Sequence, residues 1–174
     1  QTGGPSGGCI PYSLKETPVD FDSLTKVGSM MGSGGMIVMD SRDCMVDVSR
    51  YFLNFLEEES CGKCIPCRLG LVRMRRMLDA FAAGNGSEQD IDDLMSLSQA
   101  VKDGSLCALG SSAPNPVLTT LHYFRDEYLS HIQSQTCPAG VCKDLIHYRI
   151  DPDLCTGCGE IGRASCRERV YTKV

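Results

Sequence analysis

Cysteines are the residues of this chain best suited to chemistry. There are eleven of them, and three recur at every third position in the segment Ser60-Cys61-Gly62-Lys63-Cys64-Ile65-Pro66-Cys67. A C-x2-C-x2-C run allows three thiolates to wrap one face of an iron-sulfur cubane, and a glycine inside the run permits the tight turn. The fourth thiolate must then come from another part of the chain.

Cys107 is the best candidate for this fourth ligand, because it lies in a loop bounded by Gly104 and Gly110. A zinc site is the alternative, but it would normally use two separated C-x2-C pairs. Lys63 and Arg68, beside the run, are expected to influence the reduction potential. We therefore predict a 4Fe-4S site whose ligands, called the cluster cysteines below, are Cys61, Cys64, Cys67 and Cys107.

A second group combines one imidazole with two thiols. His131 is followed by Cys137 and Cys142, and ligands of mixed nitrogen and sulfur type favour zinc over an iron-sulfur cluster. Cys44 is the best candidate for a distant fourth ligand. From spacing alone, two buried thiols and a surface histidine are an equal alternative. The other histidines, expected on helix faces, are His122 and His147.

A third group begins at Cys155 and Cys158. It resembles the opening of a bacterial ferredoxin module, but the next thiols of that motif belong at positions held by Ile161 and Ser165. We therefore expect an incomplete ferredoxin cluster site. The sequence from about residue 161 resembles a translated sequencing adaptor, so we expect residues 161–174, including Cys166, to be a non-native tail.

Four segments of helical periodicity must position these cysteines. Asp43 and Asn115 are predicted N-caps of the first and fourth segments, and Ser87 with Asp90 forms a capping box at the third. Four amphipathic helices with short connections predict a bundle, which brings the loops of Cys61 and Cys107 to the same end. The segments cover residues 43–56, 68–84, 87–101 and 115–128.

Residues 1 to about 42 differ in composition from the helical part. They are rich in Gly, Pro, Ser and Thr, with short apolar pieces at Val19–Phe21 and Gly35–Met39, which predicts turns and a few strands. The opening glycines lack the Gly-Lys-Ser/Thr of a phosphate-binding loop, so tight turns are expected. Because the chain starts at Gln1 and enters this region directly, we expect it to be a fragment of a longer protein.

The bulk composition excludes several classes of protein. A formal charge of -5 offers no basic surface for nucleic acid. No signal peptide or apolar stretch long enough to span a bilayer is evident. We therefore expect a cytoplasmic protein with no nucleic-acid partner and no membrane span.

These motifs together resemble the flavoprotein, NADH-oxidising subunit shared by respiratory Complex I and the electron-bifurcating FeFe-hydrogenases. The resemblance covers residues 1 to about 160. Its most specific segments are Gly3–Pro11, Met31–Gly35, Glu59–Cys64, Ala113–Pro116 and Cys137–Cys142.

The resemblance implies an α+β fold in four parts. Residues 1–42 would be the C-terminal part of a soluble-ligand-binding β-grasp (SLBB) domain, and residues 43–134 a four-helix bundle that binds a 4Fe-4S cluster. Residues 135–160 would be a zinc/cysteine hinge and the start of a truncated ferredoxin-like module, followed by the tail 161–174. A zinc site near the bundle is also implied, and its matching residues are Cys44, His131, Cys137 and Cys142.

The implied function is electron relay between FMN and other iron-sulfur clusters of an NAD(P)H-linked oxidoreductase. FMN and NAD(P)H belong to a domain expected before Gln1, so no catalytic residue is assigned to this chain. The extension beyond the bundle favours a hydrogenase β-type subunit, with a thioredoxin-like 2Fe-2S subunit and a catalytic hydrogenase or formate dehydrogenase subunit as partners. The alternatives are a respiratory NADH-quinone oxidoreductase subunit and a zinc-stabilised, non-redox binding module.

Overall fold

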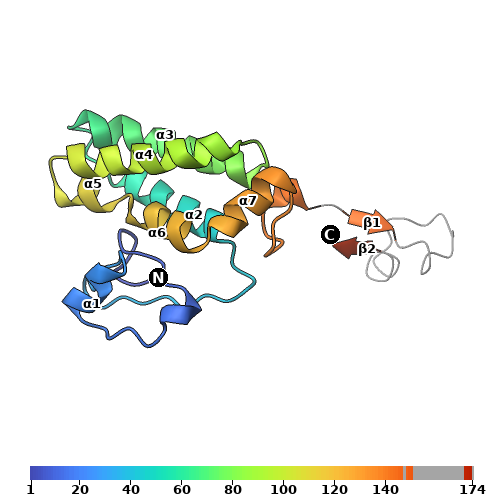
Figure 1. The fold of residues 1–174 in the computed structure, drawn as a ribbon. Helices are drawn as coiled ribbons and strands as arrows, with labels where there is room; N and C mark the ends of the chain where they lie inside the picture. Colours follow the sequence, from blue (N-terminus) through green and yellow to red (C-terminus); the bar gives the residue numbers. More distant parts are fainter. Residues whose placement is uncertain (147, 151–170, 174) are drawn as a thin grey trace.

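A computed structural model describes residues 1–146, 148–150 and 171–173 of the chain. Its regular structure is mostly helical, and the predicted bundle is confirmed (Figure 1). The bundle has four helical segments, and the fourth segment consists of two helices. The segments are α2 (Met45–Glu58), α3 (Ile65–Ala82), α4 (Glu88–Gly104), and α6 (Asn115–Tyr123) with α7 (Arg125–Gln133).

Shorter elements flank the bundle. The helix α1 (Phe21–Lys26) and the 3-10 turn η1 (Tyr12–Leu14) lie in the N-terminal part, and α5 (Ala108–Ser112) connects α4 to α6. Beyond the bundle come the 3-10 turn η2 (Lys143–Leu145) and one antiparallel pair of strands, β1 (Tyr148–Ile150) with β2 (Tyr171–Lys173).

The core lies between α2, α3, α4 and the α6–α7 pair. Leu53, Leu71, Leu78 and Leu94 are completely buried there, one or two from each long helix. Full burial of such a side chain stabilises the fold by about 1.5–3 kcal/mol. The apolar stripes at helical spacing therefore account for the packing of the bundle.

A buried tyrosine on α7 contacts three other helices, α2, α3 and α6. The Tyr128 ring packs edge-on against Phe81, with ring centroids 5.9 Å apart. Its hydroxyl lies 3.0 Å from Ser49 Oγ and 2.8 Å from Thr120 Oγ1. This hydroxyl is therefore fully hydrogen-bonded in an otherwise apolar interior.

Replacing Tyr128 by phenylalanine should lower the free energy of unfolding by about 1–2 kcal/mol, because two buried hydroxyls lose their shared partner. Ser49 and Thr120 keep bonds to backbone carbonyls, which limits the loss. Denaturant unfolding of the variant measures the effect, with Tyr51→Phe, at a 71% exposed tyrosine, as the control. A loss equal in the two variants would contradict a role for the buried hydroxyl.

The N-terminal part differs from the prediction. Neither predicted strand forms: Phe21 begins α1, and Thr2 instead makes isolated antiparallel bridges to Gly8 and Met36. A partial β-grasp is therefore not confirmed in residues 1–42. The predicted tight turns are present, since Gly3 and Gly4 have positive φ and the Gly7 amide donates to the Gly4 carbonyl.

Three predicted helix starts were wrong. Cys44, not Asp43, is the N-cap of α2, and the Asp43 carboxylate accepts from the Asp40 amide. Helix α3 begins three residues before Arg68, because a proline near the helix start needs no hydrogen-bonded amide. Asn115 is already helical, with its side chain donating to the Ser6 carbonyl across the molecule.

The fourth predicted helix is two helices. Phe124, with φ -129° and ψ 32°, departs from helical geometry and separates α6 from α7. Apolar spacing could not reveal the break, because Leu121 and Tyr128 are buried on either side of it. The break lets α7 pack against α2, α3 and α4 while α6 packs against α2 and α4.

The capping box at the start of α4 is confirmed. Ser87 Oγ accepts from the Asp90 amide, and the Asp90 carboxylate accepts from the Ser87 amide and hydroxyl. These bonds to Ser87 hold the pKa of Asp90 below its ordinary value. The stabilisation is therefore present above the unfolded-state pKa and is lost as pH falls through the folded-state pKa.

Asp90→Asn should consequently be less stable than the wild type at neutral pH, by a few tenths to about 1 kcal/mol. The difference between the two proteins should shrink as the pH falls through the folded-state pKa of Asp90. Thermal unfolding of both proteins across this acidic range measures it. Asp93→Asn, on the same helix, is the control, and a difference independent of pH would contradict the assignment to Asp90.

Several predictions lie outside the described residues. They concern His147, the cysteines Cys155, Cys158 and Cys166, and most of the expected tail 161–174. His122 lies exposed on α6, as expected. Among the described helices, none has the length and apolarity needed to span a membrane.

Candidate metal centres

The C-x2-C-x2-C run forms the connection between α2 and α3. Gly62 adopts φ +70°, and the chain turns there before Cys64 caps α3. Of the three thiols, Cys61 is exposed, Cys64 half-buried and Cys67 buried in the first turn of α3. The predicted turn at the glycine is therefore confirmed, and the three thiols occupy one end of the bundle.

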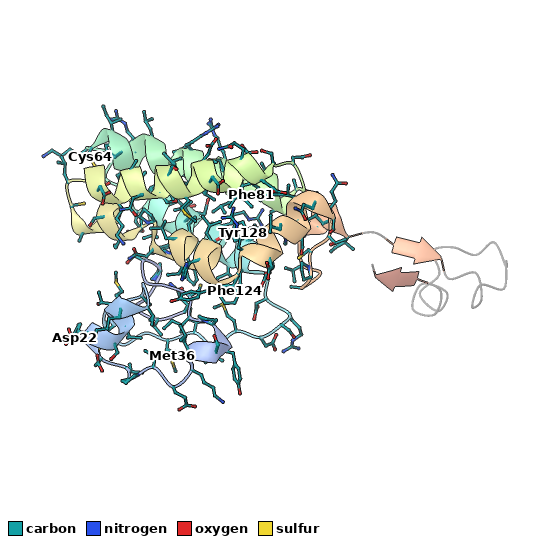
Figure 2. All side chains as sticks on the ribbon, viewed as in Figure 1. Asp22, Met36, Cys64, Phe81, Phe124 and Tyr128 are labelled. Atoms are coloured by element: carbon teal, nitrogen blue, oxygen red, sulfur yellow. The ribbon has the colours of Figure 1, made fainter. Side chains whose placement is uncertain are left out.

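The loop of Cys107 lies at this same end. A Cβ atom added at Gly104 would lie 3.1 Å from Pro66 Cγ, and one added at Gly110 would lie 3.1 Å from the Cβ of Cys67 and overlap the Ser105 hydroxyl. Glycines thus allow the two loops to approach closely. Figure 2 shows Cys64 at this end, with Phe81 and Tyr128 farther along the bundle.

Hydrogen bonds from both loops favour the thiolate form of Cys64. Backbone amides of Leu106 and Cys67, and the Ser105 side chain, lower the pKa of this thiol. Sequence reasoning did not identify Ser105, because only its position near Cys107 sets it apart from other serines. The donors around Cys64 are of the type that stabilises sulfur ligands of an iron-sulfur cluster.

Cys67 experiences the other cluster cysteines as neighbouring charges. Burial is the largest cause of its raised pKa, Ser60 opposes the shift, and Cys64, Cys107 and Cys61 add to it. Mutual repulsion of this kind is relieved when cationic iron binds between thiolates. The four thiols therefore fit an iron-sulfur cluster in type, and the two loops that carry them lie against one another at one end of the bundle.

The two basic residues expected to influence the reduction potential, Lys63 and Arg68, have different surroundings. Arg68 Nη1 donates to the Gly62 carbonyl at 3.0 Å, so its direct role is to hold the turn. Lys63 is exposed.

The predicted zinc ligands form a compact set of side chains. The side chains of Cys44, His131, Cys137 and Cys142 are all buried, and their ligand atoms lie within 4.8 Å of one another. His131 Nε2 lies 3.4 Å from the sulfur of Cys44 and 3.3 Å from that of Cys142, and the two sulfurs are 3.8 Å apart. These four residues are called the Cys/His group below.

These distances suit a tetrahedral zinc ion. Zinc–sulfur bonds of about 2.3 Å and zinc–nitrogen bonds of about 2.0 Å, at tetrahedral angles, put two sulfurs about 3.8 Å apart and a nitrogen about 3.5 Å from a sulfur. His131 is also held correctly, because its Nδ1 donates to the Glu127 carbonyl at 2.7 Å and leaves Nε2 for a metal.

Glu127, which sequence reasoning did not identify, joins the two halves of the group. Its carbonyl orients His131, and its carboxylate accepts from the Met45 amide at 2.9 Å, next to Cys44. In His131, burial alone would lower the pKa, but bonds to Cys44 and to the Glu127 carbonyl outweigh it and raise the pKa to about 9.

Helix α2 separates the two candidate sites. Cys44 caps its N-terminus, and the C-x2-C-x2-C run follows its C-terminus. Fourteen helical residues span about 21 Å at 1.5 Å per residue. The Cys/His group and the cluster cysteines are therefore distinct sites at opposite ends of one helix.

Comparisons with known proteins relate the part of the chain that holds the cluster cysteines to iron-sulfur binding proteins. Residues 47–131 match the family described as the NADH-ubiquinone oxidoreductase-F iron-sulfur binding region. The chain is 50% identical, over 159 residues, to the NADP-reducing hydrogenase subunit HndC of Solidesulfovibrio fructosivorans, an alignment that covers 91% of this chain and 32% of the relative. It is 40% identical over 136 residues to an NADH-quinone oxidoreductase subunit of Rhizobium meliloti (strain 1021), covering 78% of this chain and 32% of that relative.

A solved structure shares the fold. The crystal structure of an NAD+-reducing NiFe-hydrogenase in the H2-reduced state matches with a TM-score of 0.68 and 30% identity, over 76% of this chain and 23% of that chain. The chain spans about a third of the length of the curated relatives described above. The match to the NADH-ubiquinone oxidoreductase-F iron-sulfur binding region spans residues 47–131, and this stretch holds all the cluster cysteines.

Proposed function

We propose that this chain is the electron-relay part of an NAD(P)H-linked oxidoreductase subunit, with the cluster cysteines as the ligands of a 4Fe-4S cluster. Such a cluster, when bound, accepts and releases single electrons. The chain's own residues would hold it: Cys61 and Cys64 come from the α2–α3 connection, Cys67 from the first turn of α3 and Cys107 from the α4–α5 loop. No described residue is assigned a catalytic role.

The observation that carries this proposal is the approach of two loops distant in sequence. A Cβ atom added at Gly104 would lie 3.1 Å from Pro66 Cγ, and one added at Gly110 would lie 3.1 Å from Cys67 Cβ, so the loop of Cys107 lies directly against the C-x2-C-x2-C run. A cubane has four irons, so its ligating sulfurs stand farther apart than those around one zinc ion. The partly exposed cluster cysteines and the compact, buried Cys/His group thus suit different metals.

The complex that this relay serves is proposed from the relatives. Identity and coverage are higher toward the NADP-reducing hydrogenase relative than toward the NADH-quinone oxidoreductase relative, which supports a hydrogenase β-type role. Electrons would pass between FMN, reduced by NAD(P)H in a part of the longer protein, and clusters of other subunits. A thioredoxin-like 2Fe-2S subunit and a catalytic subunit would be the partners, in the cytoplasm.

For residues 1–42 we propose the end of a β-grasp domain. Support comes from the backbone around Thr2, which bridges to both Gly8 and Met36, and from bonds between Gln1 and Ile37 in both directions. Exposed apolar side chains, including Val38 at 84% exposure, line this region. Packing against the rest of such a domain would cover them. For Cys155 and Cys158 we keep the proposal of an incomplete ferredoxin site.

The Cys/His group is proposed as a structural zinc site. All four ligands are protein side chains and all are buried, which leaves no open position for a substrate. Zinc has no redox chemistry in proteins, so this site would fasten the segment after α7 to the start of α2 and take no part in electron transfer.

Anaerobic reconstitution of the full chain with iron, sulfide and zinc tests the proposed function. We expect about four irons and about one zinc per chain, a brown colour that fades on reduction, and a low-temperature EPR signal from the reduced cluster. A colourless protein that holds only zinc would instead identify the chain as a zinc-stabilised binding module.

A further inference from the structure

The hydroxyl of Ser60 lies beside a buried ligand sulfur. Ser60 Oγ is 3.2 Å from Cys67 Sγ, at the point where the chain leaves α2. Cys67 is only 4% exposed, the least accessible of the cluster cysteines. A hydrogen bond to this sulfur therefore acts with little competition from water.

The neighbouring backbone determines the direction of this hydrogen bond. Ser60 Oγ accepts from the Gly62 amide at 3.3 Å, which occupies an acceptor position on the hydroxyl oxygen. A thiolate that binds iron carries no proton, so it can only accept. The hydroxyl proton of Ser60 must then point to Cys67, and the amide behind it strengthens the bond by polarisation.

The turn that presents the Gly62 amide is itself fixed. Gly62 has φ +70°, a conformation that favours glycine. The Arg68 guanidinium donates to the Gly62 carbonyl at 3.0 Å and so holds the peptide from the other side. The Gly62 amide and the Ser60 hydroxyl thus form a chain of two donors that ends on the Cys67 sulfur.

We propose that Ser60 is a positioning residue that raises the reduction potential of the cluster through its hydrogen bond to Cys67. The inference rests on the proposed function. One-electron reduction adds negative charge to the cluster and its sulfurs, so a donor aimed at a thiolate stabilises the reduced form more than the oxidised form. Ser60 need not touch any electron partner to have this effect.

A redox titration of the reconstituted full chain, with dithionite as the reductant and EPR of the reduced cluster as the readout, tests this. Ser60→Val removes the hydroxyl, and Ser60→Thr has nearly the same shape but keeps it. At a fixed solution potential, the ratio of reduced to oxidised cluster in Ser60→Val should be about three- to tenfold below that of the wild type. The change is no larger because the hydrogen bond to Cys67 is present in both oxidation states and is only somewhat stronger in the reduced one. A tenfold change corresponds to about 59 mV for one electron.

Ser60→Thr should retain the wild-type ratio, as should Ser112→Ala, whose hydroxyl at the same end of the bundle donates to the Ala108 carbonyl. Loss of the cluster from Ser60→Val with retention in Ser60→Thr also supports the hydroxyl's role. If the Val and Thr variants have the same ratio of reduced to oxidised cluster, the inference about Ser60 is overturned while the proposed function stands. If the wild type takes up no iron, the proposed function fails, and the inference fails with it.

Discussion

Replacing Cys107 by serine should remove most of the iron from the reconstituted full chain and abolish or alter the EPR signal of the reduced cluster. Cys107 is the one cluster cysteine supplied by the α4–α5 loop, while the other three share a single connection. With only three thiolates, one iron of a cubane lacks its cysteine ligand. Iron quantitation and low-temperature EPR, compared with the wild type, measure the effect.

Cys9→Ser is the matched control for this experiment. Cys9 is a buried thiol in the N-terminal part and belongs to neither ligand group, and its amide donates to Thr119 Oγ1. The control variant should keep the iron content and EPR signal of the wild type. Wild-type iron and an unchanged EPR signal in Cys107→Ser would show that Cys107 is not a ligand.

The cluster loop could be predicted from sequence because its constraints are local. Three cysteines at every third position, with a glycine that permits the turn, specify a loop that wraps one centre, and Gly62 has the expected positive φ. The position of Cys107 followed from bundle topology, since connections between antiparallel helices alternate between the two ends. Both inferences depend on spacing and direction, which a sequence displays.

Features that depend on distant contacts could not be predicted in this way. Asn115 has the sequence signature of an N-cap, yet its side chain bonds the Ser6 carbonyl and Lys102. Phe124 interrupts the last helix although the apolar spacing continues across it. In α2, Val46 and Leu53 are completely buried while Phe55, also apolar, is 44% exposed, a difference that apolar spacing alone does not reveal. Tertiary packing decides these details, and local propensity does not record it.

The Cys/His group could be predicted from the sequence only in part. Cys137 and Cys142 are near His131 in sequence, but Cys44 is 87 residues from His131. Spacing alone left ordinary buried thiols as an equal alternative. The structure brings all four side chains together, and the outer partner of His131, the Glu127 carbonyl, is a backbone group on the same helix that no side-chain motif could reveal.

The two proposed sites lie at opposite ends of the bundle and would have different roles. The cluster cysteines are partly exposed, which suits electron exchange with other cofactors, whereas the Cys/His group is buried. Because α2 holds them about 21 Å apart, loss of one metal should leave the other in place. Stability and electron transfer can therefore be tested independently in one chain.

Cys142→Ala should remove zinc and lower the free energy of unfolding by about 4 kcal/mol or more, since losing a structural metal is among the few changes of that size. For a chain of this length the melting temperature should fall by roughly 10 °C. The reason is geometric: Cys142 Sγ contacts both the Cys44 sulfur and His131 Nε2, so its ligation fastens the segment after α7 to the start of α2.

Zinc quantitation and thermal unfolding of the zinc-loaded full chain measure the result, and Cys9→Ala provides the control. That variant truncates an equally buried thiol and should cost about 1 kcal/mol with no loss of zinc. The EPR signal of the cluster should survive in Cys142→Ala, because the cluster cysteines lie at the other end of α2. If the wild type binds no zinc and Cys142→Ala is no less stable than Cys9→Ala, the Cys/His group is a set of packed side chains, and the anchoring of residues 137–145 rests on the burial of Leu145 and its neighbours.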